Sequence, residues 1–250
     1  MDLQLIGKRA LVTGATRGIG RAIANGLHAE GCSVSICARD AAAVAAWVTA
    51  HPGSCGEAVD VADAHALSRW VERSAASLGG IDILVCNASA LAVGATPEAF
   101  RQAFETDLMH TVVAANSALP FLEQSKAGSI VAISSVSGSE DYGYGDAAYG
   151  TMKASLLFYI KTLSRHLAPR GIRANVVSPG TTWFEAGFWH KVELEDPEDF
   201  ADAMSRNPMG RMATPEDIAN AVIFLSSAAA SFVTGVNLVV DGGLTRRVQN

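Results

Sequence analysis

The feature that most constrains the fold of this chain is a regular alternation of short aliphatic runs with segments of helix length. The runs lie at 10–13, 33–37, 83–86, 130–133, 174–177 and 238–240. Between the first two runs, apolar residues recur at helical spacing from Ile19 to Leu27, and Gly31 stands where a helix would end. This alternation is typical of a parallel sheet covered by helices. The sequence therefore predicts an α/β fold with a doubly wound parallel sheet.

The chain has enough apolar residues for one large core, since 49% of its 250 residues are hydrophobic and 18% are charged. No linker-like stretch, charge block or internal repeat divides it. We therefore expect a single domain over residues 1–250. The one irregular region, 181–208, interrupts the alternation, and we expect it to form an insertion over the sheet edge where ligands of such folds bind.

The net charge of −6, from 19 Lys and Arg against 25 Asp and Glu, argues against DNA, RNA or an anionic membrane surface as a partner. The four cysteines form no C-x-x-C pair, and the first residues lack the order of a secretion signal. No window approaches the ~18 apolar residues of a membrane span. These features predict a cytoplasmic protein. The six histidines show no metal-ligand spacing, so we expect no metal site.

A glycine-rich turn follows the first predicted strand and reads Thr13-Gly14-Ala15-Thr16-Arg17-Gly18-Ile19-Gly20. Glycines at this place let the backbone approach a pyrophosphate, whose charge is favoured by the N-terminus of the following helix. The three-residue gap between the first two glycines differs from the common G-x-G-x-x-G spacing. The turn therefore predicts a nucleotide site, with an ordinary glycine turn as the alternative.

Tyr149, Lys153 and Ser135 form a second candidate group. Four-residue spacing puts Tyr149 and Lys153 on one helical face, where the ammonium group can lower the pKa of the phenol from its ordinary value of about 10. A tyrosine tuned in this way can act as a general acid. Ser135 follows the preceding predicted strand. An isolated pair of this kind would more often belong to the surface of an amphipathic helix.

Taken together, the motifs resemble the short-chain dehydrogenase/reductase family over the whole chain. The resemblance implies a Rossmann-like fold, a homodimer or homotetramer, and hydride transfer between a nicotinamide cofactor and a carbonyl carbon. In that scheme Tyr149 gives or takes the proton, Ser135 hydrogen-bonds the carbonyl oxygen, and Lys153 holds the nicotinamide ribose while tuning the tyrosine. The matching segments are Thr13-Gly14-x-x-x-Gly18-Ile19-Gly20, Asp60-Val61, Asn87-Ala88, Ser135, Tyr149-x-x-x-Lys153, Ser178-Pro179-Gly180 and Val240-Asp241-Gly242-Gly243.

Two arginines indicate which nicotinamide cofactor is used. Ala38 occupies the place where an acidic residue would bind an NAD ribose, Arg39 follows it, and Arg17 lies inside the glycine turn. Guanidinium groups there suit the 2′-phosphate of NADP, which we therefore prefer to NAD. By the resemblance Asp60 bonds the adenine amino group, with a helix cap before Ala62 as its alternative. The expected cofactor-binding residues are Gly14, Thr16, Arg17, Gly18, Ile19, Gly20, Arg39, Asp60, Val61, Asn87, Ala88, Tyr149, Lys153, Pro179, Gly180 and Thr182.

Two positions near these residues depart from the family pattern. Asp107 stands where the family usually has an asparagine that supports a proton relay through its backbone carbonyl, and we include it among the expected catalytic residues. Either the carbonyl alone matters, or the carboxylate is ionised and couples to Lys153 and Tyr149. Ser89 replaces a glycine that is usual in the loop beside the cofactor.

Aromatic side chains of the insertion predict an apolar substrate pocket. One of them, Phe184, stands where the family often has a threonine, which leaves Thr182 as the expected partner of the nicotinamide amide. We expect a medium-sized hydrophobic ketone or the matching secondary alcohol as the substrate. The expected substrate-binding residues are Tyr142, Trp183, Phe184, Phe188 and Trp189.

Two other functions fit the sequence less well. A 3-oxoacyl reductase acting on a carrier-protein or CoA thioester is suggested by the resemblance. However, residues 185–202 hold seven acidic side chains and one lysine, which would repel an acidic carrier. A non-catalytic sensor that binds NADPH is the other alternative, and the intact set of Ser135, Tyr149 and Lys153 argues against it.

Overall fold

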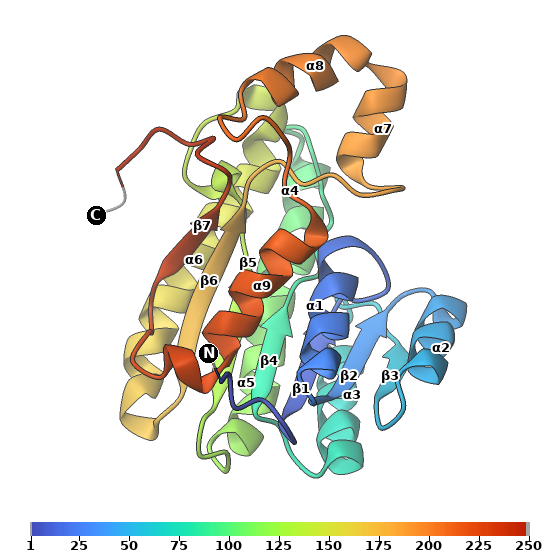
Figure 1. The fold of residues 1–250 in the computed structure, drawn as a ribbon, viewed down its shortest axis with the longest axis vertical. Helices are drawn as coiled ribbons and strands as arrows, with labels where there is room; N and C mark the ends of the chain where they lie inside the picture. The colour runs from blue at the N-terminus through green and yellow to red at the C-terminus, as the bar shows by residue number, and fades with distance from the viewer. Residues whose placement is uncertain (1, 249–250) are drawn as a thin grey trace.

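The computed structural model describes residues 2–248, apart from the side chain of Tyr144, and shows the predicted Rossmann-like α/β domain (Figure 1). Seven parallel strands form one sheet in the order β3-β2-β1-β4-β5-β6-β7. The order reverses direction between β1 and β4, which creates a switch point where ligands of such sheets bind. The strands are β1 (Arg9–Thr13), β2 (Ser33–Ala38), β3 (Cys55–Ala58), β4 (Ile83–Cys86), β5 (Ser129–Ile133), β6 (Arg173–Pro179) and β7 (Asn237–Val240).

Helices cover both faces of the sheet (Figure 1). Two clusters of apolar side chains are buried in the domain. Alternate residues of β1 serve the two clusters: Val12 packs with α1 and α9, and Leu11 packs with α3, α5 and α6. Strands buried on both faces must be aliphatic throughout, which explains the runs in the sequence. The helices are α1 (Gly18–Ala29), α2 (Ala41–Ala50), α3 (Ala64–Leu78), α4 (Pro97–Ala103), α5 (His110–Leu122), α6 (Ala147–Leu167), α7 (Phe188–Glu195), α8 (Pro197–Ser205) and α9 (Pro215–Ser226).

The irregular region at 181–208 contains α7 and α8, which lie beyond the carboxyl ends of the strands (Figure 1). An isolated bridge between Thr182 and Ala213 joins the start of this region to the segment that follows it. Among the described residues no helix is both long and apolar enough to cross a lipid bilayer.

Two elements lie outside the sequence-based expectation. Strand β3 reads Cys-Gly-Glu-Ala, without an aliphatic run, because it is an edge strand whose place is set by pairing with β2. A π-helical turn, Phe104–Met109, joins α4 to α5 and contains Asp107. Such widened turns often occur at functional sites.

A partly buried ion pair between Arg9 and Asp82 stabilises the amino-terminal end of the sheet. Asp82, directly before β4, accepts from Arg9 Nε at 2.7 Å, from the Arg9 backbone N–H at 3.0 Å and from Ser125 Oγ at 2.6 Å. Burial raises the pKa of Asp82, but the hydrogen bonds from Arg9 and Ser125 outweigh it and hold the pKa below its ordinary value. The pair therefore connects β1, β4 and the end of α5.

We expect Asp82→Asn to lower the free energy of unfolding by about 2 kcal/mol or more at pH 7, because the guanidinium loses its buried partner. The folded-state pKa lies below the unfolded value of about 3.9, so this stabilisation is present above that pH and is lost as the pH falls through the folded-state pKa. Urea unfolding of both proteins at pH 7 and at acidic pH measures the difference, which should shrink in acid.

The matched control is Glu98→Gln, which breaks the exposed pair between Arg101 and Glu98, whose side chains are 74% and 77% exposed. It should change stability by less than about 0.5 kcal/mol. Equal small effects of both substitutions would contradict the role of Asp82.

Candidate active site

The glycine turn between β1 and α1 is held tightly against the loop that follows β4. Gly14 and Gly18 have φ of +65° and +52°, which other residues rarely adopt. A Cβ atom on Gly20 would lie 2.3 Å from the carbonyl oxygen of Gly14 and 2.4 Å from Asn87 Nδ2. Arg17, the N-cap of α1, makes no capping side-chain bond, and the first turn has no acidic residue. The first amide groups of α1 can therefore face an anion, as a pyrophosphate requires.

Hydrogen bonds join the two loops at the switch point into one unit. Buried Thr13 accepts at Oγ1 from the N–H groups of Asn87 and Ala88, at 2.9 and 3.1 Å. The Asn87 side-chain amide donates from Nδ2 to the carbonyl oxygens of Thr13 and Gly14, at 3.0 and 3.1 Å. These contacts fix the floor of the expected dinucleotide site.

His110 is a neighbour of this unit that the sequence did not predict as a site residue, because it belongs to none of the motifs. His110 is buried, and its Nε2 lies 3.3 Å from Thr13 Oγ1. Burial lowers the pKa of His110 to about 4, so the ring is neutral at neutral pH. Because Thr13 Oγ1 already accepts two N–H groups, its proton is directed toward His110.

Ser135, Tyr149 and Lys153 come together where β5 ends and α6 begins. Ser135 caps a 3₁₀ turn, Val136–Gly138, and a Cβ atom on Gly138 would lie 2.7 Å from the carbonyl carbon of Lys153. This close approach brings the turn directly onto α6. Lys153 Nζ lies 5.4 Å from the centre of the Tyr149 ring.

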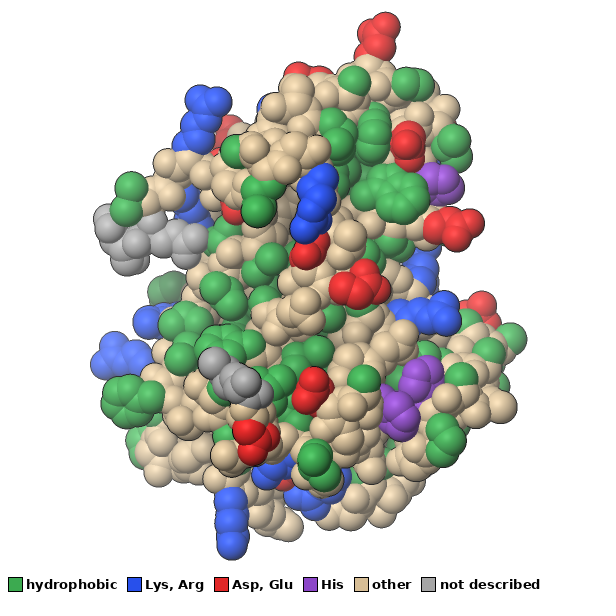
Figure 2. Space-filling model, in the orientation of Figure 1, with side chains coloured by type: hydrophobic (Ala, Val, Ile, Leu, Met, Phe, Trp, Pro, Cys, Tyr) green, Lys and Arg blue, Asp and Glu red, His purple; other side chains and the backbone are tan. Residues whose placement is uncertain are grey.

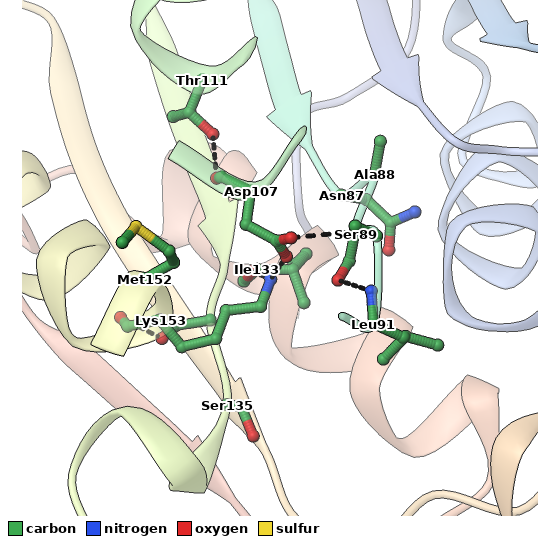
Figure 3. A network of polar contacts seen from close by, with 12 residues as sticks. Asn87, Ala88, Ser89, Leu91, Asp107, Thr111, Ile133, Ser135, Met152 and Lys153 are labelled. Atoms are coloured by element: carbon green, nitrogen blue, oxygen red, sulfur yellow. Dashed lines mark hydrogen bonds and ion pairs between the residues drawn. The ribbon is translucent and has the colours of Figure 1, made fainter. Parts of the chain in front are cut away.

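The ammonium group of Lys153 is buried and held by two partners (Figure 3). It donates to the carbonyl oxygen of Ile133 at 3.0 Å and forms an ion pair with Asp107 Oδ1 at 3.0 Å. Burial lowers the pKa of Lys153, but the charge and hydrogen bond of Asp107 together with the charge of Tyr149 outweigh it, so the pKa is raised and the ammonium form is kept. The structure therefore brings Asp107 together with the other three expected catalytic residues.

The pKa of Tyr149 differs from the sequence-based expectation. Burial is the largest influence and raises it, Lys153 and Ser135 lower it, and the charges of Asp107 and Asp146 raise it, so that the pKa lies above its ordinary value. Lys153 thus acts in the expected direction but does not bring the pKa below its ordinary value. The phenol form dominates at neutral pH, which suits a proton donor.

Other expected cofactor residues line the same edge of the sheet. Asp60 Oδ1 accepts the N–H of Ala62 at 3.0 Å, but the N-cap of α3 is Asp63, so Asp60 is not the helix cap named as its alternative. Thr182 Oγ1 donates to the carbonyl oxygen of Gly180 at 3.2 Å, and Arg39 is exposed directly after β2. The remaining expected residues of the turns are Thr16, Arg17 and Ile19 after β1, Val61 after β3, and Pro179 at the end of β6.

The insertion begins by crossing the glycine turn. The ring of Phe184 packs on Gly18, where a Cβ atom would lie 2.5 Å from Phe184 Cζ, and Arg17 donates to the carbonyl oxygen of Ala186 at 3.2 Å. Trp183 donates to Glu193 at 2.8 Å and remains partly exposed. Figure 2 shows hydrophobic side chains beside acidic ones in the upper region, where α7 and α8 lie in Figure 1.

Tyr142 lies in a different place from the other expected substrate-binding residues. It lines a cavity of about 370 Å³ with the first turns of α6. Trp183, Phe184, Phe188 and Trp189 are not among the residues that line this cavity. Phe188 and Trp189 instead contact each other edge to face at the start of α7.

We expect Gly20→Ala to weaken binding of the reduced nicotinamide cofactor by about tenfold or more, because the new methyl group collides with backbone that cannot give way. Titration calorimetry with NADPH and NADH measures the affinity. Gly145→Ala is the control, since its Cβ atom would meet nothing within 4 Å. Affinity unchanged in the Gly20 variant would contradict the cradle assignment.

Comparison with known proteins agrees with this geometry. The family model for enoyl-(acyl carrier protein) reductase matches residues 14–245. Isoepoxydon dehydrogenase patN of Aspergillus clavatus is 38% identical over 96% of this chain and 95% of its own length. The 3-oxoacyl-[acyl-carrier-protein] reductase FabG of Escherichia coli is 35% identical over 95% of this chain and 97% of its own length. The crystal structure of gox2181 superposes with a TM-score of 0.90, at 30% identity and 97% coverage of each chain. The chain therefore belongs to the short-chain dehydrogenase/reductase family, oxidoreductases of carbonyl and alcohol groups that use a nicotinamide dinucleotide.

Proposed function

We propose that this protein is an NADPH-dependent reductase that converts a medium-sized hydrophobic ketone to a secondary alcohol, and the reverse. The observation that carries the proposal is the convergence of Ser135, Tyr149 and Lys153 beside the glycine turn and the loop after β4. A non-catalytic sensor would have no need of this buried group.

Each residue of the site has a separate role in the proposed reaction. The bound nicotinamide supplies or accepts the hydride. Ser135 orients the carbonyl oxygen, and the Tyr149 hydroxyl gives that oxygen a proton. Lys153, fixed between Ile133 and Asp107, presents its remaining N–H bond and its charge to the cofactor ribose and the phenol. The glycine turn and the loop after β4 hold the dinucleotide in place.

Charge at the adenosine end supports NADP as the cofactor. Arg17 lies in the glycine turn, Arg39 is exposed directly after β2, and Ala38 brings no carboxylate that would repel a 2′-phosphate. Arginine forms bidentate hydrogen bonds with phosphate, so both side chains suit the 2′-phosphate of NADP.

The names of similar proteins support a small carbonyl compound as the substrate. Besides isoepoxydon dehydrogenase, L-xylulose reductase of Homo sapiens is 33% identical over 97% of this chain and 98% of its own length. The aromatic residues of the insertion favour an apolar substrate over a sugar.

Reduction of a carrier-linked 3-oxoacyl group is the second candidate function, favoured by the similarity to FabG. The acidic residues of α7 and α8 oppose it, because an acidic carrier would approach a surface of its own charge. A panel of ketones, 3-oxoacyl thioesters and secondary alcohols, assayed by nicotinamide absorbance with both cofactors, separates the two functions.

We expect Tyr149→Phe to lower turnover by ~100-fold or more, because the substitution removes the proton donor. Cofactor binding should be unchanged, because the fold is preserved. Tyr159→Phe, further along α6, is the control and should keep the parental rate. Parental turnover in the Tyr149 variant, with cofactor saturating, would refute the proton-donor role.

We also expect the double substitution Arg17→Ala and Arg39→Ala to weaken NADPH binding by about 10-fold to 100-fold, since charge-assisted bonds contribute about 1.5–3 kcal/mol. NADH binding should change little. The ratio of the two affinities is the readout, because loss of the contact between Arg17 and Ala186 affects both cofactors alike. Arg21→Ala, on the exposed side of α1, is the control. Equal loss for both cofactors would rule out the NADP assignment.

A further inference from the structure

The two departures from the family pattern, Asp107 and Ser89, meet in one network beside the catalytic group (Figure 3). The Asp107 carboxylate is fully buried between two donors. Its Oδ1 lies 3.0 Å from Lys153 Nζ, and its Oδ2 accepts the N–H of Ala90 at 3.1 Å. Ser89 Oγ accepts the N–H of Leu91 at 3.1 Å, where φ is +47°. Side-chain acceptors therefore shape the loop that follows β4.

This setting favours a side chain at position 107 with an oxygen at both of its terminal atoms. A carboxylate accepts hydrogen bonds at both oxygens, whereas an asparagine amide has one accepting oxygen and one donating nitrogen. If that oxygen faced Lys153, the amide N–H groups would face the N–H of Ala90. Aspartate accepts the N–H of Ala90 at Oδ2 and pairs with the ammonium group at Oδ1, and its negative charge offsets the positive charge of that group.

The charges that act on Tyr149 come from three residues. Lys153 lies one turn away on α6, Asp146 is the N-cap of α6, and Asp107 lies on the π-helical turn. Ser135 faces the phenol with a neutral hydroxyl, and neutral His110 adds no charge from α5. Lys153 is the one positive group in this set, and Asp107 pairs with it directly.

We infer that Asp107 is a positioning residue that balances the charge of Lys153 and keeps Tyr149 in its phenol form, which confines alcohol oxidation to alkaline pH. The inference rests on the proposed function. In reduction, the carbonyl carbon accepts the hydride, the carbonyl oxygen takes the Tyr149 proton, and the phenolate regains a proton from water. Oxidation is the reverse and starts from the phenolate. A phenol that resists ionisation extends the pH range of reduction and narrows that of oxidation.

The test is Asp107→Asn, with turnover measured against pH in both directions at saturating cofactor. The alkaline rise of oxidation and the alkaline fall of reduction should both move about one unit to lower pH, the smaller end of what a neighbouring charge produces. Ser89→Gly is the control, because it changes the same loop without changing charge. Its two pH profiles should match those of the parent protein, whatever happens to its rate.

A second measurement needs no bound cofactor. Tyrosinate absorbance is followed during alkaline titration, and Tyr149→Phe identifies the signal of that residue among the four tyrosines. In the parent protein the tyrosinate absorbance of Tyr149 should appear at a pH above the ordinary tyrosine pKa of about 10. In Asp107→Asn it should appear at a lower pH than in the parent protein. Circular dichroism over the same range shows that the fold persists.

Unmoved pH profiles and an unmoved tyrosinate titration in Asp107→Asn would overturn the inference. If that variant does not fold, the tyrosinate titration of the parent protein tests the inference by itself. Ionisation of Tyr149 at or below the ordinary tyrosine pKa would overturn the inference as well. Failure of the proposed function has a different signature, which is parental turnover in Tyr149→Phe.

Discussion

The close approach of two backbones at the switch point of the sheet is the constraint on which the site depends. Gly20 lets α1 begin against the carbonyl oxygen of Gly14, and Asn87 bonds across to β1. A side chain at position 20 would separate these loops. Because all seven strands are parallel, their carboxyl ends meet at one edge, and the expected catalytic residues after β5 come to the same edge.

The second constraint is a buried charge pair, Asp107 with Lys153, close to the apolar core. Asp107 and Lys153 are both buried, and neither would be stable there alone, because an unpaired charge is costly to remove from water. The pair tolerates burial because Ile133 and Ala90 supply further hydrogen bonds. The π-helical turn holds Asp107 where its carboxylate reaches across to α6.

The helices of the insertion contribute little to the apolar core of the domain. They stand apart from both buried clusters, while the first residues of the insertion lie on the glycine turn through Phe184 and Arg17. The sequence can therefore vary over α7 and α8 without disturbing the sheet. Relatives of similar length and fold carry names that point to different substrates.

The sequence by itself determined the parallel sheet, since strands buried on both faces must be aliphatic and their runs are visible without a structure. It also placed Tyr149 and Lys153 on one helical face, because that depends only on local spacing. Strand β3 was not visible, because an edge strand is placed by its neighbour and not by its own composition. The ion pair between Asp107 and Lys153, the role of His110 and the raised pKa of Tyr149 were decided only by tertiary structure. Each depends on burial and on distances between residues far apart in the chain, which no local pattern records.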